Sequence, residues 1–256
     1  MRKRLIIIAA FFVLSLSMVS SGTANETQVI AGAGPSTVVV QLFAKTIKVD
    51  GYSFEVPPKS AKHAGGIKNS GEYLFGRTGR PLNDKEKAMN KAEIFLARIP
   101  IAFAVGPDTE VSSLTIEQIE KLFTGGAATW KDVGGADEPV ATIGREATEA
   151  LFSVLKKEYP FFNNAKFGSV VKKDHQVVGL LRSPQGANAI GFGAKPNFDK
   201  AMIETVPVDG FLVGVSVGLV YDLKNSDHPL IKAAKELAAS DAWAKKVTAS
   251  GLLPPQ

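Results

Sequence analysis

A glycine-rich turn between a strand pattern and a helical pattern constrains this chain more than any other stretch. The turn, Ala-Gly-Ala-Gly at 31–34, lets the backbone bend tightly and approach a ligand closely. Pro35 follows, and its fixed φ suits the first position of a helix. Apolar residues then recur at helical spacing through 39–47, while 28–30 can end a strand. The sequence therefore predicts a strand, a tight turn and a helix in direct succession.

The first turn of this predicted helix is suited to bind an anion. Gly34, Ser36 and Thr37 lie there, where backbone N–H groups have no intrahelical partner and the helix dipole is positive. A strand-to-helix turn that is capped by hydroxyl groups and binds nothing has the same pattern. The motif alone therefore leaves both interpretations open.

Helical and strand-like segments alternate along the rest of the chain without an internal repeat, which is typical of the α/β class. Two apolar strands are expected at 99–105 and 211–221. Between them, Thr115 and Gln118 have capping-box spacing at the start of a helical pattern. These elements are enough for one large domain or two smaller lobes.

A second glycine cluster lies at 64–68, where the chain reads Ala-Gly-Gly-Ile-Lys. We expect a short strand at 59–63 and a turn at Gly65 and Gly66, because consecutive glycines are typical of turns.

The N-terminus has the pattern of a secretory signal peptide. Three basic residues at 2–4 precede an apolar run at 5–19, and small residues follow at 20–24. The apolar run is about 15 residues, short of the ~20 that span a bilayer. We expect a signal peptide over 1–24 that is cleaved near Ala24, with an uncleaved membrane anchor as the alternative.

Composition excludes several classes of protein. The chain has no cysteine, so disulfides and cysteine–zinc sites are excluded. The net charge is +5, but three basic residues and no acidic residue lie in 1–24, so residues 25–256 carry only +2. A charge this close to balance gives no reason to expect nucleic acid or an anionic membrane as a partner.

The sequence offers no pattern for catalysis. The three histidines, His63, His175 and His228, are far apart and match no metal-ligand spacing. No serine lies in a nucleophile elbow, and no glycine loop ends in Gly-Lys-Ser. Carboxylates that the fold brings together stay open, because sequence does not show distance. We therefore expect a binding protein that is not an enzyme and that holds no metal or cofactor.

Arginines in turns are better candidates for function. Arg77 and Arg80 lie in a glycine-bearing turn at 75–82, and Arg145 lies between a strand pattern at 140–143 and a helix start. Arginine grips tetrahedral oxyanions with two parallel hydrogen bonds, and open α/β sheets bind ligands beyond the carboxyl ends of their strands. Arg145 has that position. For Arg77 and Arg80 an ion pair at the surface or between lobes is an equal alternative.

Nine short motifs occur together in an order that is known from one family. They are Gly32-Ala33-Gly34, Gly65-Gly66-Ile67-Lys68, Arg80-Pro81-Leu82, Leu114-Thr115, Phe123-Thr124-Gly125, Thr129 to Gly135, Arg145-Glu146, Ala189 to Phe192, and Ser250 to Pro254. The chain resembles the phosphate-binding proteins of ABC importers, as a short and divergent member, over nearly all of 25–256. The resemblance implies a two-lobed periplasmic binding protein of type II with two crossing hinge strands. The lobes would be 25–105 plus 211–256, and 106–210.

The resemblance also implies a ligand site between the lobes. We expect it to hold Gly34, Ser36, Thr37, Gly65, Gly66, Arg77, Thr78, Arg80, Arg145 and Thr148, with Arg145 as the main contact. The sequence departs from the family at three places. Ala64 replaces a serine, Gly79 replaces an aspartate that accepts the phosphate proton, and the loop after Arg145 is shortened. We therefore expect weaker discrimination between phosphate and sulfate, with Glu146 as the one nearby acid that could replace the aspartate.

The function implied is capture of phosphate or a similar tetrahedral oxyanion for an ABC importer. The protein would act in the periplasm as a monomer and would deliver its ligand to the permease subunits. The alternative is a binding or sensing module without a transport role, which recognises a larger phosphorylated compound or a protein partner.

Overall fold

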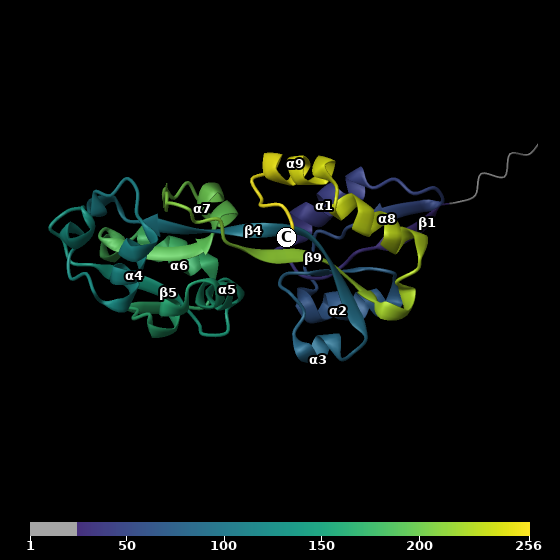
Figure 1. Ribbon diagram of the computed structural model, residues 1–256, viewed down its shortest axis with the longest axis horizontal. Helices are drawn as coiled ribbons and strands as arrows, with labels where there is room; N and C mark the ends of the chain where they lie inside the picture. Colours follow the sequence, from purple (N-terminus) through teal and green to yellow (C-terminus); the bar gives the residue numbers. More distant parts are fainter. Residues whose placement is uncertain (1–24) are drawn as a thin grey trace, which may run out of the picture.

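Two long antiparallel strands, β4 (Lys91–Val105) and β9 (Gly214–Asp222), run through the middle of the molecule and connect its two lobes (Figure 1). The computed structural model describes residues 25–256. The expected signal peptide and its cleavage site lie outside the described residues. Within the described part of the chain, no helix is long and apolar enough to cross a membrane.

The main sheet is shared by both lobes. Its order is β3-β9-β4-β7-β5-β6, and β8 pairs with β4 beside this path. The first lobe also has a two-stranded parallel sheet of β1 and β2. The strands besides β4 and β9 are β1 (Glu26–Val29), β2 (Tyr52–Glu55), β3 (Gly76–Thr78), β5 (Ala141–Arg145), β6 (Ser169–Val171), β7 (Ala189–Ala194) and β8 (Thr205–Val206).

Helices cover the sheets in each lobe (Figure 1). The first lobe has α1 (Thr37–Thr46), α2 (Lys62–Glu72), α3 (Asp84–Lys87), α8 (Pro229–Ala238) and α9 (Asp241–Ala249). The second has α4 (Ile116–Thr124), α5 (Ala150–Glu158), α6 (Asp174–Leu181) and α7 (Lys195–Lys200). This mixed architecture confirms the predicted α/β class and two-lobed form.

The strand β4 changes partners where it passes from one lobe to the other. Its last pair with β9 joins Pro100 to Gly214, and its first pair with β7 joins Ile101 to Ala194. The change of partner therefore lies inside β4, a few residues before the lobe boundary at 105 that the family resemblance implied.

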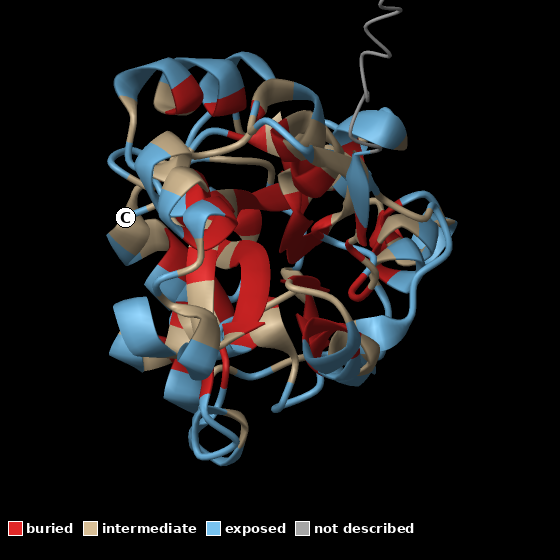
Figure 2. Cartoon of the chain, turned by 90° about the vertical axis from the view of Figure 1, so that its right-hand side faces the viewer, coloured by how far each residue is buried: buried red, intermediate tan, exposed pale blue. Residues whose placement is uncertain are grey.

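Aromatic side chains fill the interior of both lobes. In the first lobe, the Phe43 ring lies 6.3 Å from that of Trp243, and the Trp243 indole N–H donates to the Leu96 carbonyl at 2.7 Å. In the second, Phe123 lies 5.4 Å from Phe162, within a larger group of phenylalanines. Figure 2 shows buried segments in the interior and exposed helix faces on the outside. Burial of this kind is the main stabilising contribution in a chain without disulfides.

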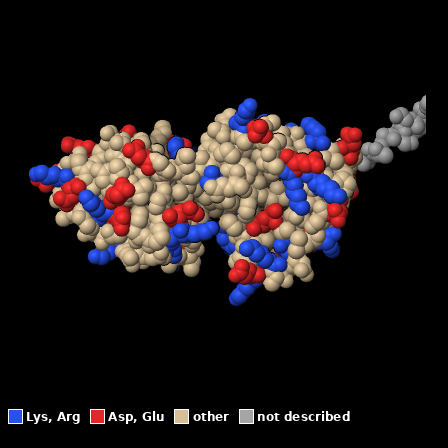
Figure 3. Space-filling view, viewed as in Figure 1, with Lys and Arg blue, Asp and Glu red and all other residues tan. Residues whose placement is uncertain are grey.

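Charges are mixed over the surface. On the face shown in Figure 3, basic and acidic side chains alternate over both lobes without a field of one sign. This distribution agrees with the near-balanced charge of residues 25–256.

The prediction for the second glycine cluster was wrong. Residues 62–72 form α2, so neither a strand at 59–63 nor a turn at 64–68 is present. The glycines permit close packing instead. A Cβ atom on Gly66 would lie 2.2 Å from the carbonyl oxygen of Arg77, and one on Gly76 would lie 1.8 Å from the carbonyl oxygen of Gly66. Glycine at these positions lets α2 lie directly against β3.

Candidate binding cleft

A cleft of about 610 Å³ lies between the lobes, above the crossing strands β4 and β9. The first lobe contributes the turn before α1 and the residue after β3. The second contributes the starts of α5 and α6 and the helix α7. The polar and turn residues along it are Gly34, Pro35, Gly79, Glu149, Asp174, Asn197, Lys200 and, after α9, Ser250.

The turn before α1 is held by its own hydrogen bonds and by β3. The Ala33 N–H donates to the Arg77 carbonyl at 3.1 Å, and the Ser36 hydroxyl, which is buried, donates back to the Ala33 carbonyl at 3.1 Å. The Thr37 N–H donates to the Gly34 carbonyl at 3.0 Å. Gly34 and Pro35 line the cleft, so α1 begins at its wall. The predicted strand, turn and helix are confirmed here, and Gly32 has the φ of +144° that favours glycine.

Arg77 lies behind this turn and supports it. Its side chain is fully buried, and it donates to the carbonyl oxygens of Ala33 at 3.0 Å, Ile30 at 2.9 Å and Lys59 at 3.3 Å. Burial lowers the pKa of this guanidinium from its ordinary value. The sequence pattern placed Arg77 at the ligand, whereas the structure uses three of its donors to fix main-chain carbonyls.

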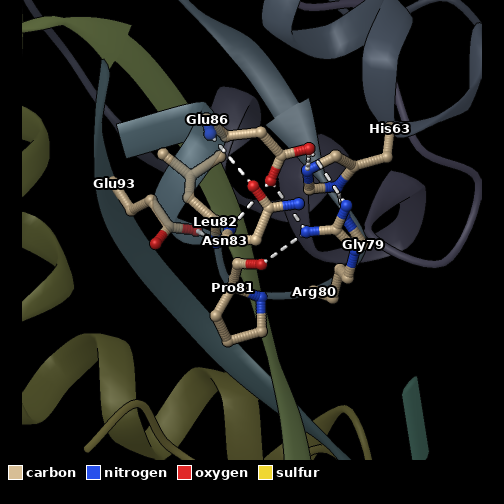
Figure 4. Close-up of polar contacts among 8 residues, drawn as sticks. All are labelled: His63, Gly79, Arg80, Pro81, Leu82, Asn83, Glu86 and Glu93. Atoms are coloured by element: carbon tan, nitrogen blue, oxygen red, sulfur yellow. Dashed lines mark hydrogen bonds and ion pairs between the residues drawn. The ribbon is translucent and has the colours of Figure 1, made fainter. Parts of the chain in front are cut away.

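Arg80 is committed to an acidic partner in the same lobe (Figure 4). Its guanidinium donates to both carboxylate oxygens of Glu86, at 2.8 and 3.0 Å, and to the Pro81 carbonyl at 2.8 Å. The hydrogen bonds from Arg80 are the main cause that lowers the pKa of Glu86 to about 2. The ion-pair alternative is therefore the one that the structure shows for Arg80.

Arg145 ends β5 and holds together the wall of the second lobe. It is buried, forms an ion pair with Asp174 and donates to the Lys172 carbonyl at 3.2 Å. Its Nη2 also lies 3.8 Å from Oε1 of Glu149, whose other oxygen accepts from the Phe152 N–H at 2.9 Å and caps α5. The buried Nε of Arg145 has no hydrogen-bond partner among residues 25–256.

The carboxylates beside the cleft are Glu149 and Asp174, which the sequence reasoning missed. Glu149 could have been found, because it lies four residues after Arg145 and directly before an apolar helix. Asp174 is brought to Arg145 by the parallel pairing of β5 with β6 and has no local signal. The acid that the sequence suggested, Glu146, is exposed and lies 3.7 Å from Lys172.

The remaining predicted residues differ in their surroundings. Thr148 is exposed in the turn after β5, and Gly65 and Gly66 lie in α2. Thr78 is fully buried, and its hydroxyl has no hydrogen-bond partner within the part of the chain that the structure describes.

Gly79, where the family resemblance implied an aspartate, has no room for a side chain. A Cβ atom there would lie 2.9 Å from the Cβ of Ala33 and 3.5 Å from the side chain of Pro35. The segment after β3 therefore packs directly on the turn before α1.

Comparisons with known proteins agree with this architecture. Residues 19–214 match the PBP superfamily domain. The chain is 25% identical over 212 residues to the phosphate-binding protein PstS of Borreliella burgdorferi, which covers 77% of this chain and 76% of that protein. A putative phosphate ABC transporter substrate-binding protein from Clostridium perfringens, solved with bound phosphate, superposes with a TM-score of 0.63 at 23% identity and covers 90% of this chain and all of that one. An ABC-type phosphate transport receptor from Vibrio cholerae gives 0.58 at 18% identity, with the same two shares. At these identities the likeness to solved structures shows the fold alone. The match of residues 19–214 to the family model covers most of the chain and shows that the chain belongs to the PBP superfamily.

Proposed function

We propose that this protein captures inorganic phosphate, or a similar tetrahedral oxyanion, and delivers it to an ABC importer. The relatives support this ligand class, because one is a phosphate-binding protein and another was solved with bound phosphate. The cleft supports it independently, because a helix begins at one wall and a buried arginine stands behind the other.

The observation that most supports the proposal is two buried polar atoms without a hydrogen-bond partner within residues 25–256. The Thr78 hydroxyl and the Arg145 Nε are buried without a partner among the described residues, and they belong to opposite lobes. Thr78 precedes Gly79, which lines the cleft, and Arg145 contacts Glu149 and Asp174, which also line it. Buried polar atoms normally have partners. Neither residue lines the cleft directly, so a bound oxyanion would supply a partner to each after a local movement that uncovers these atoms.

The proposed ligand contacts come from both lobes. In the first, Gly34 and Ser36 would donate backbone N–H groups, and Thr37 and Thr78 would donate their hydroxyls. In the second, Arg145 would be the main contact, and Thr148 would approach the ligand only if the turn after β5 moves on closure. Arg77 and Arg80 would hold the first-lobe loops in place.

We also propose that the protein acts outside the cytoplasm, in the periplasm, after cleavage near Ala24. The basic, apolar and small-residue pattern of 1–24 motivates this. N-terminal sequencing of the exported protein should give a start near Asn25, and an intact Met1 in the membrane fraction would contradict it.

A thermal-shift screen with phosphate, arsenate, sulfate and molybdate tests the ligand class, followed by titration calorimetry. A ligand that binds only the folded state stabilises it, by about 2.7 kcal/mol at one hundred times its Kd. Stabilisation by phosphate is the expected result. If none of these oxyanions stabilises the purified protein, the alternative of a module for a larger phosphorylated compound or a protein partner would be favoured.

A further inference from the structure

His63 lies beside the cleft and contacts the segment that lines it (Figure 4). It is on the first turn of α2, with its side chain 15% exposed. Its Nδ1 accepts a hydrogen bond of 3.5 Å from the Gly79 N–H. Its Nε2 lies 3.3 Å from Oε1 of Glu86, yet it is buried and forms no well-directed hydrogen bond with any described residue.

The surroundings fix the position of the imidazole. Glu86 is held by both Arg80 hydrogen bonds, and together with Asn83 it forms the capping box of α3. On the other side, Gly79 packs against Ala33 at the turn before α1. His63 therefore stands between a fixed carboxylate and the first-lobe wall of the cleft.

The hydrogen bond from Gly79 requires a neutral imidazole. Nδ1 can accept only when it carries no proton, which places the proton on Nε2, toward Glu86. Protonation converts Nδ1 into a donor, so that two N–H groups then face each other. The Gly79 N–H must then turn away from His63, and the cleft lies beside it.

We propose that His63 is a positioning residue that couples pH to the anion affinity of the cleft. In its neutral form it holds the Gly79 N–H away from the cleft. In its protonated form it releases that N–H and adds a positive charge beside the ligand. The inference rests on the proposed oxyanion function of the same cleft.

The charged groups around His63 set the pH range of this coupling. Glu86 faces it from α3 and Arg80 faces it from the segment after β3. Exposed Lys62 neighbours it on α2, and the Arg77 guanidinium lies on β3, turned toward main-chain carbonyls. Burial, and then Arg80, lower the pKa of His63 below 6.5, while Glu86 opposes them. The imidazole is therefore neutral at pH 7, and it becomes protonated only at a pH below its ordinary pKa of 6.5.

The direction of the effect follows from linkage. A bound anion stabilises the imidazolium, so the pKa of His63 rises on binding and affinity increases as pH falls through this range. A rise of one pKa unit corresponds to about tenfold tighter binding in acid.

Titration calorimetry with inorganic phosphate from pH 5 to pH 8 tests the inference on three proteins: the parent, His63→Gln and His228→Gln. His228 is the matched control, because its imidazole caps α8 through the Leu230 N–H and does not line the cleft. Phosphate itself titrates in this range, so the informative quantity is the ratio of Kd between variant and parent at each pH. For His63→Gln this ratio should rise by several-fold up to about tenfold between pH 8 and pH 5. For His228→Gln it should stay constant.

A constant ratio for His63→Gln would overturn the inference, since a purely structural role lowers affinity equally at every pH. Absence of phosphate binding by the parent at all pH values would instead overturn the proposed function, and this inference with it. NMR titration of the His63 imidazole in the parent protein gives a second test that needs no variant. Its pKa should rise when saturating phosphate is added, and an unchanged or lowered pKa would also overturn the inference.

Discussion

At the scale of single residues, burial and hydrogen-bond partners decide which arginine can serve a ligand. Arg77 and Arg145 are both buried, but three donors of Arg77 are taken by main-chain carbonyls. Arg145 retains an unused Nε and is paired with two carboxylates that line the cleft. Removal of Arg145 should therefore affect ligand affinity, whereas removal of Arg77 should affect the stability of the fold.

Arg145→Ala should reduce phosphate affinity by about 2–5 kcal/mol, because a buried anion loses its charged partner. Arg77→Ala should instead destabilise the fold by about 2–4 kcal/mol, because buried carbonyls lose their donors and a cavity is left. Calorimetry and urea unfolding of both variants separate the two effects. Near-equal phosphate affinity of Arg145→Ala and the parent would contradict the assignment.

Selectivity is also decided by single residues. Hydrogen phosphate carries a P–OH that can donate to a carboxylate, whereas sulfate carries no proton and is repelled. The sequence suggested only Glu146 for this task, but the structure places Glu149 and Asp174 at the cleft and Glu146 outside it. We therefore now expect the protein to reject sulfate more strongly than the Gly79 departure alone implied.

Glu149→Gln should raise sulfate affinity relative to phosphate, because it removes the repulsion and keeps an oxygen for capping α5. Glu146→Gln is the matched control and should leave the ratio unchanged. Competition calorimetry from about pH 6 to pH 8.5 spans the second phosphate pKa, near 6–7. If the ratio of sulfate affinity to phosphate affinity is equal for the parent and Glu149→Gln, this carboxylate does not select the ligand.

Glu86 makes a prediction about acid stability. Hydrogen bonds from Arg80 lower its folded pKa to about 2, well below the unfolded value of 4.5. A carboxyl group shifted in this direction stabilises the fold above pH 4.5, and this contribution is lost as pH falls toward 2. Glu86→Gln should therefore cost roughly 1–3 kcal/mol at pH 7 and progressively less in acid.

Urea unfolding of Glu86→Gln and the parent at pH 7, 4.5 and 3 measures this difference. Asp137→Asn is a suitable control, since its ion pair with Lys131 is 70% exposed on both sides and contributes little. A difference that stays constant down to pH 3 would mean that the Arg80–Glu86 pair does not cause the shift.

At the scale of elements, local sequence signals placed the start of α4 correctly, although they missed α2. The helix α4 begins with the predicted capping box of Thr115 and Gln118, and it ends at Gly125 in the left-handed conformation. Both signals act within a few residues, so they need no information from the rest of the fold. The crossing strand β4 is different, because its pairing with β9 and then β7 depends on distant parts of the chain.

Thr115→Ala should destabilise the second lobe by about 1 kcal/mol, since the Gln118 N–H loses its cap. Thr124→Ala, at the exposed end of the same helix, should change stability by less than about 0.5 kcal/mol. Thermal unfolding of the two variants compares them directly. Equal destabilisation would mean that the cap contributes nothing beyond packing.

At the scale of the whole molecule, two strands connect the lobes and the cleft lies between them. We propose lobe boundaries near Ile101 in β4 and Gly214 at the start of β9, where the chain passes from one lobe to the other. Bending at these strands would bring the Thr78 and Arg145 sides together around a ligand.

Small-angle X-ray scattering should therefore show a smaller radius of gyration when saturating phosphate is added. Arg145→Ala, measured at the same phosphate concentration, should keep the unliganded value because it binds weakly. An unchanged radius for the parent, with binding verified by calorimetry, would show that the lobes do not close.

The sequence by itself determined the elements whose signals are local. These are the strand, glycine turn and helix at 28–47 and the capping box of α4, because turn chemistry, capping and hydrophobic periodicity act over a few residues. The ordered set of family motifs also indicated the two-lobed fold.

Only the tertiary structure decided which side chains face the cleft. Gly66 was expected in a turn but lies in a helix, because the contact that requires glycine is with β3, distant in sequence. Arg77 was expected at the ligand, but three of its donors bind carbonyls from two other segments. Asp174 reaches Arg145 through the pairing of β5 with β6. Distances between side chains that are far apart in the chain are set by packing, and no local pattern of residues encodes them.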